Sequence, residues 1–124
     1  MRLEILSPAD INIDMVGRNA PDQLLVTPTR KKTKEYNGLV RRAERLSKLE
    51  GFTDLGSADQ YYERSDHFEF AKLGIPVMFL FADVHEDYHR PGDDPEKLDY
   101  DKIRRSMRLV LRILDELQDD KLDL

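Results

Sequence analysis

The chain has 124 residues, of which 40% are apolar and 36% are charged, and its formal net charge at pH 7 is −5. This composition predicts one soluble globular domain that buries roughly two-thirds of its unfolded surface. The negative charge argues against a nucleic-acid partner, and no apolar run approaches the roughly 20 residues of a membrane helix. Because cysteine is absent, any metal must be held by histidine and carboxylate side chains. The absence of cysteine does not identify the cellular compartment of the protein.

Two strands are predicted near the start of the chain. Residues 11–16 alternate apolar and polar side chains, which predicts a strand with Asp14 close to its end. Residues 22–28 predict a second strand, which Pro28 stops. We expect the two strands to form a hairpin around residues 19–21.

Two amphipathic helices and one buried strand are predicted to form the core. Residues 37–50 carry apolar side chains at helical spacing, and residues 103–117 do so over a longer stretch. Residues 75–82 form a nearly continuous apolar run, which is typical of a strand buried on both faces. Residues 119–124 are expected to be a frayed tail.

Shorter elements complete the pattern. Residues 52–55 predict a short strand, and residues 65–74 predict a short helix with Ser65 as its N-cap and Gly74 as its stop. Alternating strands and helices predict an α/β fold, here a three-layer sandwich in which helices cover both faces of a partial mixed sheet. Ligands in such folds collect beyond the carboxyl ends of the strands.

The polar loop over residues 83–98 contains HEDYH at positions 85–89, a match to the H-E-x-x-H pattern of zinc proteases. That pattern requires a helix, because only helical spacing brings both histidines to one face. Pro91 follows after one residue and leaves room for barely one helical turn. We therefore reject this interpretation and expect His85 and His89 to be separate loop residues.

A wider set of motifs fits another family. The run YHRPGDD at 88–94, preceded by RSDH at 64–67 and GIP at 74–76, resembles the C-terminal half of the two-zinc aminopeptidase family. That family includes bacterial leucyl aminopeptidases, glutamate carboxypeptidases and glutaminyl cyclases. The segment INIDMVGR at 11–18 looks like the metal-ligand motif that ends one of its strands. The resemblance implies a zinc-dependent exopeptidase whose substrate is a peptide.

The resemblance also implies roles for individual residues. Asp14 matches a carboxylate ligand of one zinc ion, and His89 matches an imidazole ligand of the other. Tyr88 matches a phenol near the substrate carbonyl, which suggests a hydrogen bond to the developing oxyanion. Asp93 is expected to accept a hydrogen bond from an imidazole or to tie down the loop. Asp66 is expected to support the wall of the site.

The same resemblance leaves the site incomplete. The family's other metal ligands and its adjacent pair of glutamates precede the Asp14 motif, whereas residues 1–13 contain no histidine and no such pair. We therefore expect residues 1–124 to be the C-terminal part of a longer zinc exopeptidase or a trimmed domain, with absent or very weak activity alone. Two alternatives remain: a non-catalytic binding module that keeps the fold, and a domain that self-associates or binds a missing N-terminal segment. His67 and His85 are expected to be structural or exposed.

Overall fold

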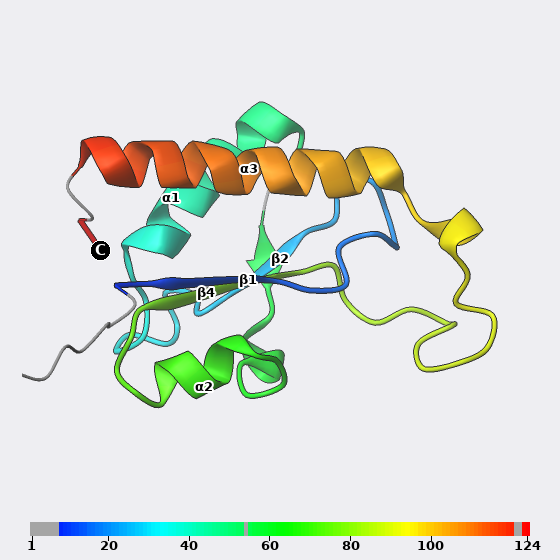
Figure 1. The fold of residues 1–124 in the computed structure, drawn as a ribbon, viewed down its shortest axis with the longest axis horizontal. Coiled ribbons are helices and arrows are strands. Elements are labelled where there is room, and N and C mark those ends of the chain that lie inside the picture. Colours follow the sequence, from blue (N-terminus) through cyan, green and yellow to red (C-terminus); the bar gives the residue numbers. More distant parts are fainter. Residues whose placement is uncertain (1–7, 54, 121–122) are drawn as a thin grey trace, which may run out of the picture.

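The computed structural model describes residues 8–53, 55–120 and 123–124, which form three layers (Figure 1). The strands are β1 (Asp10–Ile13), β2 (Leu25–Thr27), β3 (Gly56–Ser57) and β4 (Val77–Phe81). The α-helices are α1 (Gly38–Leu46), α2 (His67–Ala71) and α3 (Tyr100–Asp119). Three short 3₁₀ helices are η1 (Ser47–Glu50), η2 (Asp59–Tyr61) and η3 (Pro95–Lys97).

The four strands form one mixed sheet in the order β1-β4-β2-β3. Strand β1 runs parallel to β4, whereas β2 runs antiparallel to β4 and parallel to β3. The predicted hairpin between the first two strands is therefore wrong, because β4 lies between them. All five residues of β4 are buried, as the apolar run predicted. A strand of apolar residues is most stable inside the sheet, where neighbouring strands and helices cover it.

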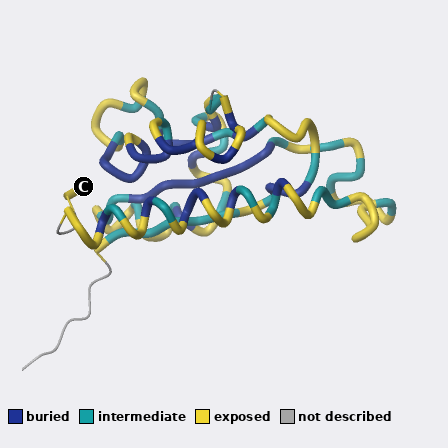
Figure 2. Tube along the Cα trace, turned by 90° about the horizontal axis from the view of Figure 1, so that it is seen from above, coloured by how far each residue is buried: buried dark blue, intermediate teal, exposed yellow. Residues whose placement is uncertain are grey.

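Helices cover both faces of the sheet, which confirms the predicted α/β sandwich. Helices α1 and α3 pack against each other on one face, and α2 lies against β1 and β4 on the other (Figure 1). Figure 2 shows buried and exposed positions alternating along α3, as expected of a helix with one apolar face.

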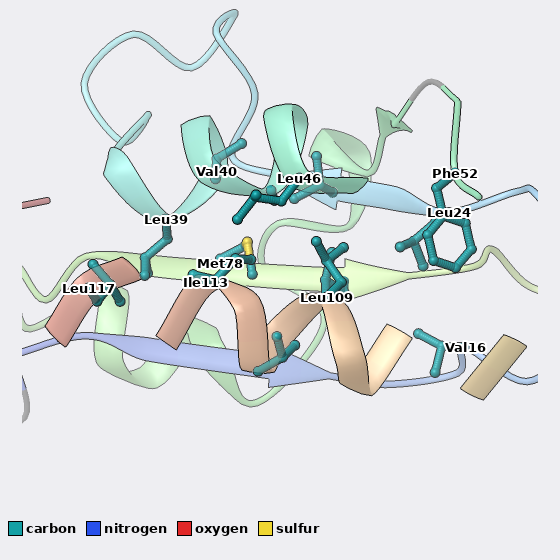
Figure 3. Packing of buried hydrophobic residues seen from close by; sticks show 14 residues of the cluster. Val16, Leu24, Leu39, Val40, Leu46, Phe52, Met78, Leu109, Ile113 and Leu117 are labelled. Carbon is teal, nitrogen blue, oxygen red and sulfur yellow. The ribbon is translucent and has the colours of Figure 1, made fainter. Parts of the chain in front are cut away.

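The main core lies between α1, α3 and the sheet. In Figure 3, side chains from both helices point toward Met78 of β4. Leu39 on α1 and Ile113 on α3 are fully buried, as is Met78 itself. Burying one such side chain stabilises the folded state by roughly 1.5–3 kcal/mol.

Polar side chains begin both long helices. The Asn37 side chain accepts a 2.9 Å hydrogen bond from the Leu39 amide at the start of α1. Asp99 accepts a bond of the same length from the Lys102 amide at the start of α3. The helix predicted over 37–50 is present as α1 followed by the tighter η1, and Gly51 ends it with a φ of 85°.

Three short predictions require correction. The helix expected over 65–74 is the shorter α2, and its N-cap position is Asp66 rather than Ser65. The strand expected over 52–55 is absent at residues 52, 53 and 55, residue 54 lies outside the described residues, and the next strand is β3. The second strand covers only part of 22–28.

The C-terminal tail lies partly outside the described residues, at 121–122. Of the remainder, the Leu124 carbonyl oxygen accepts a 2.7 Å hydrogen bond from the Gly38 amide. The Asp123 carbonyl accepts one of 2.6 Å from the Arg42 guanidinium. These contacts tie the last residues to the start of α1. None of the helices in the described part of the chain has the length and apolar composition that a bilayer crossing requires.

Candidate active site

Asp14 follows β1 directly and lies at the carboxyl end of that strand, where α/β sheets bind ligands. The residue is exposed, and one carboxylate oxygen accepts a 3.0 Å hydrogen bond from the Ser65 hydroxyl. Ser65 in turn accepts a 2.8 Å bond from the Asn12 side-chain amide. The serine predicted to cap a helix therefore orients Asp14 instead.

A buried histidine, His67, lies beside the Asn12 side chain that bonds Ser65. His67 is fully buried and stacks on Phe79 with ring centroids 4.6 Å apart. Its Nε2 lies 2.6 Å from the Tyr62 carbonyl oxygen, which can only accept, so we assign the proton to Nε2. Nδ1 then faces the Asn12 amide at 3.5 Å. Burial lowers the pKa of His67 and favours the neutral ring, so this histidine is structural, as expected.

The HEDYH segment forms turns rather than a helix, in agreement with the rejection of the zinc-protease motif. His89 has a φ of 57° and is exposed, and its ring stacks on that of Tyr88 with centroids 3.8 Å apart. The His85 side chain is only 7% exposed, and its Nε2 lies 3.8 Å from an Asp93 carboxylate oxygen. The two histidines therefore occupy different environments.

Asp14 and Tyr88 meet in one small pocket of about 80 Å³ between the β1 end and the loop. The pocket is also lined by Met15, Tyr61, Arg64, Phe79, Phe81 and Val84. Burial, and secondarily Asp83, raises the pKa of Tyr61, so its hydroxyl stays protonated at neutral pH. The pocket thus combines a carboxylate, two phenols and a guanidinium with an aromatic wall.

Two predicted supporting residues, Asp93 and Asp66, are not part of the pocket's lining. Asp93 accepts a 3.0 Å hydrogen bond from Arg18, which joins the loop to the segment after Asp14. Asp66 is exposed at the start of α2, and its side chain does not cap that helix. The proposed influence of either residue on bound metal stays a prediction.

Backbone strain concentrates in the two segments that carry the site. The non-glycine residues with positive φ in the described part of the chain are Met15, Asn19, Asp83 and His89. Such conformations cost on the order of 1 kcal/mol each, and they cluster where surrounding contacts fix a functional geometry. Here Met15 lines the pocket, and the other three lie in the segments 14–19 and 83–89, which also supply Asp14, Val84 and Tyr88 to it.

A zinc ion needs several ligands held close together, usually four in a structural site and three in a catalytic one. Within 8–53, 55–120 and 123–124, no three or more His, Cys, Asp or Glu residues are grouped so that they could hold a metal ion. Asp14 and His89 are exposed donors of types that zinc accepts, but they form no closed set with other described ligands. The described residues alone do not fit a complete zinc centre.

Sequence reasoning missed the contacts that join the two segments. The Arg18 guanidinium donates hydrogen bonds of 2.6 Å to Asp87 and 3.0 Å to Asp93. Hydrogen bonds from Arg18 and Lys97 hold the pKa of Asp87 below its usual value. Arg18 belongs to the motif that begins at Ile11, but the motif alone gives no indication of its partners.

Comparison with known proteins gives one match. The family described as "Peptidase family M28" matches residues 8–114, a range that contains all five predicted site residues. Searches of curated proteins and of solved structures returned no significant match.

Proposed function

This chain belongs to peptidase family M28, a family of metal-dependent peptidases, and on that premise we propose that it carries part of a zinc aminopeptidase site. The observation that carries the proposal is the pocket shared by Asp14 and Tyr88, with the His89 ring stacked on Tyr88. These residues come from segments far apart in the sequence and meet at the carboxyl end of the sheet.

In this proposal, Asp14 and His89 each supply one ligand, to two different zinc ions. A complete zinc site of this kind would supply an activated water molecule and polarisation of the scissile carbonyl. In the described part of the chain, no group of three or more His, Cys, Asp or Glu residues could supply the remaining metal ligands. We assign the remaining ligands and the general base to residues other than those described. We therefore expect the chain by itself to be inactive or very weakly active.

The chain's own side chains have roles that need no metal. The Tyr88 phenol is suited to donate a hydrogen bond to the carbonyl oxygen of the substrate as negative charge develops there. The rings of Tyr61, Phe79 and Phe81 line the same pocket and offer an apolar wall for the side chain of the peptide's first residue. The Ser65 hydroxyl donates to the Asp14 carboxylate and so orients it in the lining of the same pocket.

Equilibrium dialysis with zinc tests the proposal, using Asp14→Ala and His89→Ala beside the unmodified chain. Asp115→Ala, an exposed position on α3, is the matched control. We expect each site variant to weaken zinc binding by ~10-fold or more, and the control to leave it unchanged. Zinc binding that neither site variant weakens would contradict the proposal.

An aminoacyl-anilide assay on the same samples tests the second part. We expect turnover by the unmodified chain at or near background. Two tight zinc ions per chain, accompanied by turnover that both variants abolish, would keep the peptidase assignment but disprove the incomplete site.

A second candidate function is a non-catalytic, self-associating module, and one observation favours it. Edge strand β1 and helix α3 line a shallow apolar groove, with Ile11 and Ile13 on the strand. Met107 and Leu114 on α3, which line the groove, are 48% and 41% exposed, and Leu111 on the same helix is 64% exposed. An apolar surface beside an edge strand favours association with another chain.

Sedimentation velocity over a wide concentration range separates the candidates. Self-association predicts a mass that rises with concentration and returns to the monomer value in Leu111→Glu. A monomer at every concentration would remove this second candidate.

A further inference from the structure

The segment that follows Asp14 is bonded to both ends of the loop that carries Tyr88 and His89. Asn19 donates from its side-chain amide to the carbonyl oxygens of Ala82, Asp83 and Val84, at 2.7, 3.3 and 3.2 Å. These carbonyls lie where β4 ends and the loop begins. The preceding residue, Arg18, bonds the loop farther along.

Arg18 holds the loop from two sides of His89. One guanidinium nitrogen lies 2.6 Å from the Asp87 carboxylate, two residues before His89, and the other lies 3.0 Å from Asp93, four residues after it. The Arg18 and Asp87 side chains are only 13% and 15% exposed. Because a guanidinium is planar and presents several donors in a fixed fork, it sets the separation of the two carboxylates it joins.

The backbone of this segment is fixed to the long helix. The Arg18 carbonyl oxygen accepts a 2.6 Å hydrogen bond from the buried Lys102 ammonium, and the Gly17 carbonyl accepts one of 2.7 Å from the Asp99 amide. A Cβ added at Gly17 would lie 2.8 Å from the Leu98 side chain, so the chain there packs closely on the residues before α3. Arg18 therefore acts from a rigid base, which is what precise positioning of a site requires.

We propose that Arg18 is a positioning residue, which fixes the Tyr88–His89 turn relative to Asp14 by joining Asp87 and Asp93. The inference rests on the proposed function for its catalytic meaning. Its physical content is independent of metal and of turnover: without the guanidinium, the turn loses the bridge between its two arms. Asn19 still bonds the Ala82 carbonyl where the loop begins, and Lys97 keeps a 3.0 Å bond to Asp87 within the loop, so the turn loosens without being released.

Three variants of the full chain test the proposal. Arg18→Gln removes the charge and the fork, and Arg18→Lys keeps the charge but offers only a point contact. Arg104→Gln is the matched control, because Arg104 also forms a 2.6 Å salt bridge, to Asp101, on the exposed surface of α3.

The first readout is hydrogen exchange at the Tyr88, Arg90 and Asp93 amides, each of which bonds a backbone carbonyl within the turn. We expect exchange at these amides to rise ~10-fold or more in Arg18→Gln and by less in Arg18→Lys. Amides in the core of α3 keep their protection in both, and Arg104→Gln changes none of them.

The second readout is the ring-proton NMR spectrum of His89, whose stacking on Tyr88 at 3.8 Å gives it a ring-current shift. We expect this shift to collapse toward the unstacked value in Arg18→Gln and to be partly restored in Arg18→Lys. Unchanged turn amides and an unchanged His89 signal in folded Arg18→Gln would overturn the proposal. Equal loosening of the turn and of α3 would also overturn it, because Arg18 would then support the fold in general.

The two proposals fail separately. If the unmodified chain binds no zinc at Asp14 or His89 but the turn loosens in Arg18→Gln, the proposed function is disproved and the positioning role of Arg18 is supported. If zinc binds as proposed but the turn is unchanged in Arg18→Gln, only the positioning role falls.

Discussion

The layer between α1, α3 and the sheet differs from the pocket end in what holds it together. In the former, apolar side chains such as Leu39, Met78 and Ile113 are fully buried and contact one another (Figure 3). At the pocket end, Asp14 and His89 are exposed, and charged or amide side chains make the contacts that fix the two segments.

Within this small domain, the apolar core mainly determines stability, and the pocket end determines the geometry of the candidate site. Apolar burial is non-directional, and it stabilises any well-packed arrangement of these elements. Hydrogen bonds and salt bridges are directional, so they fix the strained turns at Met15 and His89 in one geometry. Substitutions in the core are therefore expected to change stability, and substitutions at the pocket end to change geometry.

The largest expected effect comes from the core. Ile113→Ala leaves a cavity at a fully buried position and is expected to lower the free energy of unfolding by about 2–5 kcal/mol. Leu111→Ala, on the same helix but 64% exposed, is expected to stay within ~0.5 kcal/mol of the parent. Urea denaturation measures both, and similar losses for the two variants would show that α3 does not bury the face described.

A buried carboxylate gives the next effect. Glu50 accepts 3.0 Å hydrogen bonds from both Arg108 and Arg112, which hold α3 against η1. Glu50→Gln is expected to cost about 1–3 kcal/mol, measured by denaturation at pH 7. Glu69→Gln, which breaks an exposed pair with Lys72, is the control and is expected to have little effect.

The same carboxylate has a predicted pH dependence. Burial opposes the ionised form of Glu50, but the hydrogen bonds from Arg112 and Arg108 outweigh it and lower the pKa below 4.5. The stabilising contribution is therefore complete above about pH 4.5 and is lost as the pH falls through the folded-state pKa. Below pH 4.5 the parent should lose stability more steeply than Glu50→Gln, and parallel curves would contradict this.

A buried lysine predicts that stability also rises with pH in the alkaline range. Burial lowers the pKa of Lys102 from 10.5 to about 8, so between these values the unfolded chain binds more protons than the folded one. Stability should rise by about 1–2 kcal/mol between pH 8 and 9.5, and Lys102→Met should remove that rise. Lys48→Met, at an exposed position, should retain it.

The smallest effect concerns the strained turn. His89→Ala and His89→Gly both remove the ring that stacks on Tyr88, but only glycine adopts a φ of 57° without a steric cost. The glycine variant should therefore be more stable than the alanine variant by about 0.5–1 kcal/mol. Thermal unfolding of the pair measures the difference, and equal stabilities would show that the left-handed turn carries no strain.

Sequence patterns predicted the core better than the strand neighbours. Whether a residue is buried depends mainly on its own side chain, so the apolar run at 75–82 and the helical spacing at 103–117 could be recognised from the local sequence. The hairpin failed because strand pairing is a long-range choice, and the fully buried β4 took the place between β1 and β2.

At the pocket end, Asp14, Tyr88 and His89 were predicted as site residues through motif resemblance alone, and their roles stay predictions. The Arg18 bridge could not be found in the same way, since its partners Asp87 and Asp93 lie 69 and 75 residues away. Nothing in a local pattern distinguishes this arginine from a solvated one. Its role becomes visible only when the fold brings the two segments together.

The most direct test of the site is a zinc titration of the isotopically labelled chain, followed by amide NMR. Shifts should centre on residues 14–19 and 84–94, with Asp14→Asn removing the first group and His89→Gln the second. Shifts centred on the acidic residues of α3, or shifts that neither variant removes, would contradict the placement of a zinc peptidase site between Asp14 and His89.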